Sequence, residues 1–254
     1  VTLGDRSVLV RSYPIGIDWD HFHKQGITGE ARQAEQRLLS STRHRTAMIG
    51  VDRLDYSKGL PERLDGIGRF FDRYPESVRE LVYIQIAPPS REDVAEYRHI
   101  RAVLEQKAGQ INGARSEVDL VPVRYVNRGY SHAELFGFYR ASKIGLVTPL
   151  RDGMNLVAKE YVAAQDPDDP GVLILSRFAG AAHQLGLDVT GAVLVNPYSP
   201  DDLGHAIKQA LGMELAERKD RYEAMVGSVR DENVENWTMR FCADLELGAV
   251  ALSG

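Results

Sequence analysis

Short runs without polar side chains recur along the chain, and polar stretches of helical length separate them. Two clear examples are Ile144–Val147 and Val172–Leu175. Runs of this kind are typical of strands that are buried on both faces, as in a parallel sheet. The pattern predicts strands at 7–13, 46–51, 81–87, 119–125, 143–148, 171–176 and 192–195.

The stretches between these strands predict helices at about 60–74, 91–110, 132–141, 155–165, 178–185 and 200–226. Because strands and helices alternate, we expect an α/β fold with right-handed crossovers, a Rossmann-like parallel sheet flanked by helices. Two flanks fit this sheet poorly and are assigned to a neighbouring domain. They are the opening strand, which ends at Pro14–Ile17, and a last helix over 231–250.

The composition is ordinary for a globular protein, with 43% apolar and 26% charged residues among 254. The net charge of −5, from 31 Lys and Arg against 36 Asp and Glu, argues against a general nucleic-acid or membrane-surface binder. It still permits a local pocket for one small anion. The single cysteine, Cys242, excludes an intrachain disulfide, fits a reducing compartment such as the cytoplasm and is expected to be buried.

Ligands of open parallel sheets bind outside the carboxyl ends of the strands, so the segments that follow strands are the first candidates. The strand at 46–51 is followed by Arg53 and Lys58, with a glycine at Gly59. A forked guanidinium and a mobile ammonium at the start of a helix suit a diphosphate. The alternative is a solvated loop in which Arg53 pairs with Asp52 or Asp55.

The segment after the strand at 143–148 carries a carboxylate, Asp152, then Gly153, and a second carboxylate eight residues on, Glu160. Gly153 allows an unusual turn and close backbone approach. The start of the next helix offers free N–H groups, expected from Met154, Asn155 and Leu156. Such carboxylates suit sugar hydroxyls, including the two of a ribose. The alternative makes Asp152 a plain N-cap and pairs Glu160 with Lys159 or Arg151.

Other candidates carry less chemistry. Arg91 stands after the strand at 81–87, in the first helical turn, where most arginines face solvent. His21 and His23 lack a third ligand at a convincing spacing, so no zinc site is expected. One helix-spaced stripe is expected to belong to the core, and it consists of Tyr97, Ile100 and Leu104.

Two long segments, 51–63 and 146–163, resemble the trehalose-6-phosphate synthases, which form glycosyltransferase family 20. Four shorter segments resemble the same family, at 85–91, 109–113, 178–182 and 195–198. The likeness runs from about Tyr13 to Trp237, nearly the whole chain. The two long motifs are far more specific than a lone glycine-rich pattern.

The resemblance implies a retaining glucosyltransferase of the GT-B architecture, in which two Rossmann-like domains face each other across a cleft. It implies transfer of glucose from UDP-glucose to glucose-6-phosphate, with no metal or other cofactor. The chain would be the C-terminal half, which fits its lack of an initial Met. Residues 1–17 would then end the acceptor domain and its linker, 18–230 form the donor domain, and 231–254 form a helix that packs back on the N-terminal domain.

The resemblance also implies roles for individual residues. Arg53 and Lys58 match the diphosphate ligands, Glu160 matches the ribose ligand, and Asp152 matches the carboxylate at the transferred glucose. Arg53, Lys58 and Asp152 would be the catalytic residues. The donor would further contact the backbone of Gly153, Met154, Asn155 and Leu156. Arg91 matches the arginine that reaches the acceptor phosphate.

Three function hypotheses remain open from the sequence. The first is the family's own reaction, of which this chain holds the donor half. The second is a related transferase or pseudo-glycosyltransferase with another acceptor, and the third is a nucleotide-sugar binding module without catalysis. Under each, the partners are small molecules rather than nucleic acid or a membrane, and the chain can form homo-oligomers. The preferred nucleotide also stays open among UDP, ADP and GDP.

Overall fold

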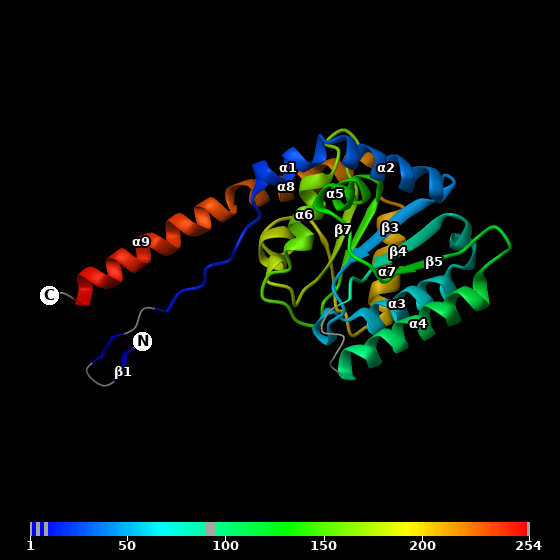
Figure 1. The fold of residues 1–254 in the computed structure, drawn as a ribbon, viewed down its shortest axis with the longest axis horizontal. Coiled ribbons are helices and arrows are strands. Elements are labelled where there is room, and N and C mark those ends of the chain that lie inside the picture. Colours follow the sequence, from blue (N-terminus) through cyan, green and yellow to red (C-terminus); the bar gives the residue numbers. More distant parts are fainter. Residues whose placement is uncertain (1, 4–5, 8–9, 90–94, 253–254) are drawn as a thin grey trace.

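The computed structural model describes the backbone of residues 2–3, 6–7, 10–89 and 95–252. Within these residues, six strands form one parallel sheet, flanked on both faces by helices (Figure 1). The strands are β3 (Thr46–Val51), β4 (Leu81–Ile86), β5 (Val123–Val126), β6 (Ile144–Val147), β7 (Val172–Ser176) and β8 (Val193–Val195). This confirms the predicted fold class.

The strand order is β5-β4-β3-β6-β7-β8, so the chain builds outward from β3 to one edge and then from β6 to the other. β3 and β6 are direct neighbours, with Met48 opposite Ile144. The order of the strands reverses at this pair. In open α/β sheets such a reversal opens a crevice at the carboxyl ends of the strands, where ligands bind.

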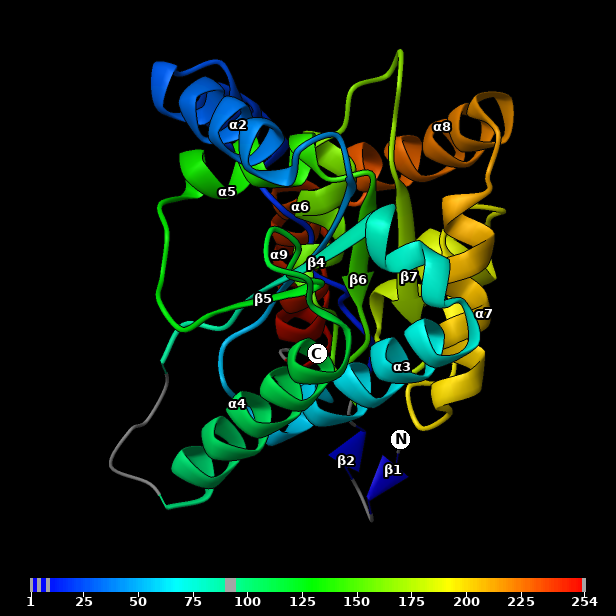
Figure 2. The same cartoon turned by 90° about the vertical axis from the view of Figure 1, so that its right-hand side faces the viewer.

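Helices cover the two faces of the sheet separately (Figure 2). One face carries α3 (Leu60–Arg73), α4 (Ala95–Arg115) and α7 (Pro200–Leu211), and the other carries α1 (Trp19–Gly26), α2 (Gly29–Thr42), α5 (His132–Ala141), α6 (Leu156–Ala164) and α8 (Leu215–Asp231). Successive strand residues point to opposite faces. Met48 therefore joins the core under α3, whereas Ile49 joins the core under α2. Burial on both faces explains the continuous apolar runs.

Most predicted elements are confirmed with shifted ends, namely the strands from 46–51 onward and the helices at 60–74, 91–110, 132–141 and 155–165. The predicted strand at 7–13 is wrong. The described residues there form a two-residue strand, β2 (Arg6–Ser7), paired with β1 (Thr2–Leu3), and 10–13 are not a strand. Among the described residues of the segment at 7–13, only Ser7 pairs with another strand.

Two other predicted helices differ from the structure. The segment at 178–185 begins as a turn and is helical only from residue 181, with α-helical residues at 181–182 and a π-helix at His183–Leu187. Its first residues do not continue the helix because their backbone pairs with the loop after β6, where Gly180 donates to the carbonyl of Asp152 (3.0 Å). The predicted helix at 200–226 is two helices, α7 and α8. Gly212 is the C-cap of α7 and leaves the helical conformation, with φ of −93° and ψ of 5°, and α8 begins at Leu215.

Two helices were missed, α1 and α2. Each begins at a side-chain cap, since Asp18 accepts a hydrogen bond from the N–H of His21 (2.8 Å) and Thr28 from that of Ala31 (3.2 Å). These caps are readable signals. Cys242 was also misjudged, because it is exposed on α9 (Val234–Leu252) rather than buried. The predicted core stripe at Tyr97, Ile100 and Leu104 is buried.

One residue of the edge strand β5, Val123, is covered by a side chain. The amide of Asn112, on α4, donates to the carbonyl of Val123 (2.8 Å) and accepts from its N–H (3.0 Å). It occupies the position that the backbone of a further strand would take.

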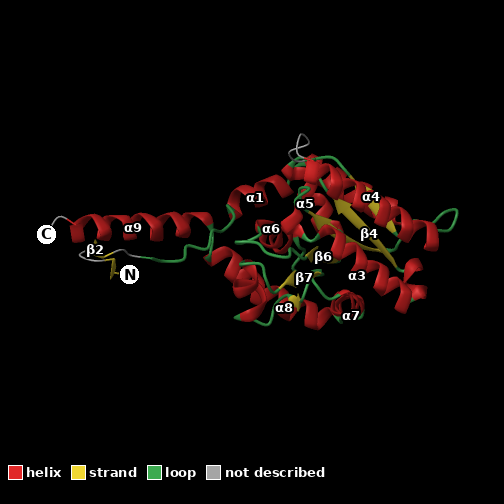
Figure 3. Cartoon of the chain, turned by 90° about the horizontal axis from the view of Figure 1, so that it is seen from below, coloured by secondary structure: helices red, strands yellow, loops and turns green. Residues whose placement is uncertain are grey.

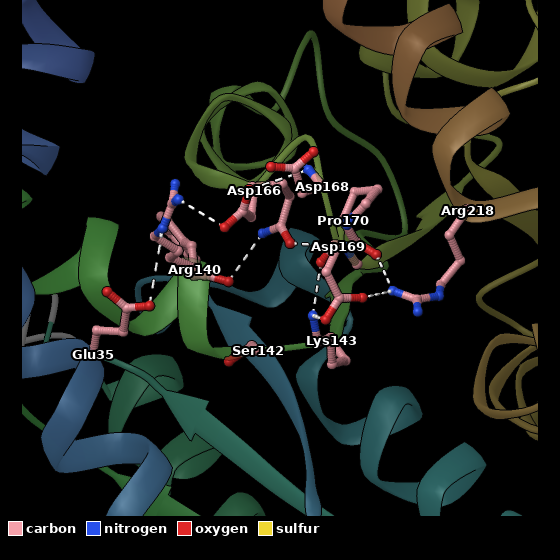
Figure 4. A network of polar contacts seen from close by, with 12 residues as sticks. Glu35, Arg140, Ser142, Lys143, Asp166, Asp168, Asp169, Pro170 and Arg218 are labelled. Atoms are coloured by element: carbon pink, nitrogen blue, oxygen red, sulfur yellow. Dashed lines mark hydrogen bonds and ion pairs between the residues drawn. The ribbon is translucent and has the colours of Figure 1, made fainter. Parts of the chain in front are cut away.

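The α6–β7 connection is fastened by charged side chains at the end of the sheet away from the crevice (Figure 4). Asp169 binds Lys143 (2.5 Å) and Arg218 (2.7 Å), and Asp166 binds Arg140 (3.0 Å). These contacts join the connection to α5, β6 and α8. They hold the far end of α6, whose near end lies at the crevice.

The chain outside the body of the domain runs as two segments on one side (Figures 1 and 3). We call residues 10–17 the arm. The arm runs alongside α9, and both project away from the sheet. Among the described residues no helix is both long enough and apolar enough to cross a membrane.

Candidate functional site

Two loops lie side by side at the reversal of the strand order. One follows β3, over residues 52–59, and the other follows β6, over residues 148–155. They are joined directly, because the N–H of Leu150 donates to the carbonyl of Ser57 (2.9 Å). The two segments with the richest predicted chemistry therefore form one surface.

The first loop is shaped by Asp55. Its carboxylate accepts hydrogen bonds from the N–H (3.0 Å) and the hydroxyl (2.9 Å) of Ser57 and caps a short 3₁₀ helix, Tyr56–Lys58. Partial burial acts to raise the pKa of Asp55, but these bonds and the nearby cations hold it below its ordinary value. Gly59 follows with φ of 63°, and a Cβ there would lie 2.8 Å from the carbonyl oxygen of Thr148. Only glycine suits this crossing of the two loops.

The side chain of Arg53 remains accessible. It is 60% exposed, and its Nη2 atom lies 3.4 Å from a carboxylate oxygen of Asp55. The alternative pairing with Asp55 is thus present. An exposed pair of this length contributes little free energy, so the guanidinium is free to bind an incoming anion.

Lys58 and Asp152 meet across the two loops and form an ion pair. Each side chain is 17% exposed. Asn155 also donates to the same oxygen of Asp152 (3.2 Å). The structure therefore brings together two residues that lie 94 positions apart and that were singled out separately in the sequence.

The backbone from Asp152 to Leu156 leaves N–H groups without acceptors. Its carbonyls are used, since Gly180 donates to that of Asp152 (3.0 Å) and Ala181 to that of Met154 (2.9 Å). The N–H groups of Met154, Asn155 and Leu156 have no acceptor among the described residues. Free N–H groups at the start of a helix form a ready anion site.

One alternative for this turn is wrong. Asp152 is not an N-cap, because α6 begins at Leu156 and its N-cap is Asn155. The residue with a left-handed backbone is Asn155, with φ of 69°. A side chain at position 153 would meet no atom within 4 Å. The turn thus depends on Asn155, which tolerates the left-handed region better than most residues.

Glu160 lies on α6 beyond the site. The hydroxyl of Tyr139 lies 3.4 Å from one of its carboxylate oxygens, and burial raises the pKa of Glu160. Glu160 does not form the alternative ion pairs with Lys159 or Arg151 among the described residues. Lys159 donates to two backbone carbonyls, and no ion pair with Arg151 is found among the described residues.

A buried network beneath the first loop was missed in the sequence. Arg63, on α3, is fully buried and contacts Asp52 (2.6 Å), Gln85 (3.0 Å) and Thr148 (2.9 Å). These partners follow or belong to three different strands, β3, β4 and β6. Tyr83 extends the network by donating to Gln85, and burial raises the pKa of Tyr83 to about 12. The network fixes the base of both loops.

Arg91, predicted at the acceptor phosphate, lies outside the described residues. Within the described part of the chain, no three His, Cys, Asp or Glu side chains gather as a metal site would require. The expectation of metal-free chemistry stays a prediction.

The fold and the site together define a Rossmann-like α/β domain with two loops and a helix start at the crevice of the sheet, where ligands of such folds bind. A family model described as glycosyltransferase family 20 matches residues 1–247. The chain belongs to glycosyltransferase family 20.

Similar proteins carry a consistent name. A trehalose-6-phosphate synthase of Sinorhizobium fredii is 46% identical over 233 residues, 92% of this chain and 49% of that protein. One of Klebsiella pneumoniae is 47% identical over 234 residues, 92% of this chain and 48% of that protein. The chain thus spans about half the length of the curated relatives it matches.

Solved structures agree. An α,α-trehalose-phosphate synthase (UDP-forming) from Burkholderia xenovorans in complex with glucose-6-phosphate gives a TM-score of 0.87 at 43% identity, over 92% of this chain and 50% of that chain. A structure from Escherichia coli bound with UDP-2-fluoro glucose gives 0.86 at 44% identity, over 92% and 51%.

Proposed function

We propose that this chain is the donor-binding half of a retaining glucosyltransferase. The reaction moves glucose from UDP-glucose to glucose-6-phosphate and yields α,α-trehalose 6-phosphate and UDP. The names and ligands of the similar proteins support this proposal. The relatives' further half would supply most of the acceptor pocket, with Arg91 reaching the acceptor phosphate from this side. The proposal includes a cytoplasmic location, since one cysteine admits no intrachain disulfide.

The observation that carries the proposal is the convergence at the strand reversal. Lys58 and Asp152 arrive from two loops and meet beside the free N–H groups of residues 154–156. We assign the diphosphate to Arg53, Lys58 and these N–H groups. Asp152 and the backbone at Gly153 then face the glucose, and Glu160 takes the two ribose hydroxyls.

The chemistry follows from where charge develops. As the glycosidic bond breaks, negative charge grows on the UDP phosphate and positive charge on the glucose. Arg53, Lys58 and the start of α6 stabilise the growing negative charge, which lowers the barrier because this charge is larger in the transition state than in the substrate. The acceptor hydroxyl attacks from the face of the departing phosphate, and that phosphate takes its proton. No protein nucleophile is required.

The proposal is tested by calorimetric titration of the 254-residue chain with UDP, UDP-glucose, ADP and GDP in EDTA. We expect selective, metal-free binding of UDP. The variant Arg53→Ala is expected to weaken it about 10- to 100-fold, the value of a hydrogen bond to a charged group. Arg69→Ala is the matched control, because Arg69 is an exposed arginine on α3 that pairs with Asp201. Equal affinity in Arg53→Ala and wild type, or no binding of any nucleotide, would contradict the proposal.

A further inference from the structure

The proposed function leaves one buried charge unexplained. Lys159, in the middle of α6, is fully buried. Its Nζ atom donates to the carbonyls of Ile15 (3.2 Å) and Glu232 (3.3 Å), and no carboxylate pairs with it among the described residues. Burial lowers the pKa of Lys159 to about 8, so the ammonium form still predominates at neutral pH. A buried ammonium is costly, and it persists only where hydrogen bonds compensate for lost hydration.

Both carbonyls belong to places where the chain crosses into or out of the domain. Ile15 lies in the arm, shortly before α1. Glu232 lies at the junction of α8 and α9. Beyond these two points the arm and α9 run away from the body together (Figure 3). One ammonium therefore holds both crossings against the same helix.

The crossings are also bound to each other. The N–H of Val234 donates to the carbonyl of Ile17 (3.2 Å), and the indole N–H of Trp237 donates to that of Tyr13 (2.9 Å). At Gly16 a Cβ would lie 1.8 Å from the carbonyl oxygen of Glu232, so the two backbones are in direct contact. The arm and α9 thus form one unit, which we call the paired stem.

The stem is attached to the helix that also forms the nucleotide site. Lys159 directly precedes Glu160, and it lies three residues, or about 4.5 Å along the axis, from Leu156 at the helix start. A short α-helix is stiff over this distance. A change in the hydrogen bonds of Lys159 therefore alters the direction of the paired stem relative to the carboxylate of Glu160 and the N–H groups at the start of α6.

We propose that Lys159 is a positioning residue that sets the direction in which the paired stem leaves the domain, relative to α6. Resting on the proposed function, this role aligns any part of the protein joined through the arm with the bound donor. Lys159 touches neither donor nor acceptor. Its loss leaves nucleotide binding intact and loosens the geometry between the two substrates.

The first test measures the stem directly. Cys242 is the only cysteine and is exposed on α9, and Gln106 is exposed on α4. Spin labels at Cys242 and at Gln106→Cys report their distance by pulsed electron resonance. We expect a narrow distribution for the parent protein and a broad one for Lys159→Met. The control Lys143→Met removes an exposed lysine bound to Asp169 and should leave the distribution narrow.

A second variant covers the case in which Lys159→Met does not fold. Gly16→Ala keeps the lysine but forces the arm away from Glu232, so it should shift or broaden the same distribution. A narrow, unshifted distribution in folded Lys159→Met, or in Gly16→Ala, overturns the proposal.

A third measurement separates this role from the proposed function. UDP should bind Lys159→Met as tightly as wild type by calorimetry. In an active protein that includes this chain, Lys159→Met should lower kcat about 10- to 100-fold and leave the KM for UDP-glucose unchanged, since misplacing reactants slows chemistry more than binding. Failure of the wild type to bind UDP would reject the proposed function, while the label distances would still decide the role of Lys159. A matched loss of UDP affinity in the variant would make Lys159 part of the binding site and overturn its role as a positioning residue.

Discussion

The ion pair between Lys58 and Asp152 means that two proposed ligands neutralise each other before the donor arrives. Under the proposed function, a diphosphate would compete with the carboxylate for the ammonium, and a displaced carboxylate would be available to sugar hydroxyls. The two events belong to one rearrangement of charges. This makes opposite predictions for UDP and for UDP-glucose when the carboxylate is neutralised.

We expect Asp152→Asn to bind UDP up to about 10-fold more tightly, because a negative charge next to the phosphates disappears. The same variant should lose any preference for UDP-glucose over UDP, since the glucose loses its charged acceptor. Calorimetry with both ligands measures the two effects. Weaker binding of UDP by this variant would show that Asp152 supports the phosphate rather than competing with it.

The half-buried carboxylate of Glu160 predicts a pH dependence of binding. Burial raises its pKa, so it takes up a proton at a higher pH than an ordinary glutamate. A protonated carboxyl accepts the ribose hydroxyls less strongly. UDP affinity should therefore fall as the pH drops through this raised pKa, and be fully present above it. Titrations across this range should show the decline in wild type and a nearly flat profile in Glu160→Gln.

At the scale of elements, the network around Arg63 holds three strand ends and α3 together. Removing the guanidinium would leave the carboxylate of Asp52 buried without its partner. We expect Arg63→Met to lower the free energy of unfolding by about 3–5 kcal/mol, the usual cost of breaking a buried ion pair from one side. Chemical denaturation measures this difference. The exposed pair on the same helix, broken by Arg69→Ala, should cost under about 1 kcal/mol.

The elements that the sequence predicted well are those whose burial permits only one type of secondary structure. β3 and β7 are buried on both faces, so their apolar runs could belong only to a central strand. The strand predicted at 7–13 failed because only Ser7 among its described residues pairs with another strand, and apolar character alone does not show whether a partner is present. The helix at 200–226 failed because Gly212, a stop signal, stands in the middle of a helical pattern. The N-cap residues Asp18 and Thr28 indicate the helices α1 and α2, which the hydrophobic periodicity did not predict.

In the candidate site, too, some features could be predicted from the sequence and others could not. The loops after β3 and β6 follow from strand order and the rule for open sheets, so Arg53, Lys58 and Asp152 could be named in advance. Their mutual contacts could not, because a pair across 94 residues depends on how two loops cross at Gly59. The Arg63 network could not be predicted, because in the sequence a buried arginine looks like any arginine on the surface of a helix. Its three partners, Asp52, Gln85 and Thr148, come together only in the fold.

At the scale of the whole molecule, the chain consists of the body of the domain and the paired stem. The sheet and its helices close around their own two cores. The stem adds exposed apolar side chains on α9, including Met239, Phe241 and Leu245. The predicted domain division at 1–17 and 231–254, and the packing of the last helix against a further domain, stay predictions.

The amide of Asn112 affects how copies of this chain associate with one another. An uncovered edge strand pairs with the edge of another copy and can seed ordered aggregates. Asn112→Ala should lower the free energy of unfolding by about 1–3 kcal/mol, because the N–H and carbonyl of Val123 lose their partners. Light scattering against concentration should show faster self-association of this variant. Scattering equal to that of wild type would mean that the rest of the edge is protected by other means.

The side chain of Asn112 therefore bears on whether a further strand can pair with the edge of the sheet. The outer edge of β5 can pair with a further strand in principle, and Asn112 occupies this edge at Val123. One substitution at Asn112 would therefore open this part of the edge.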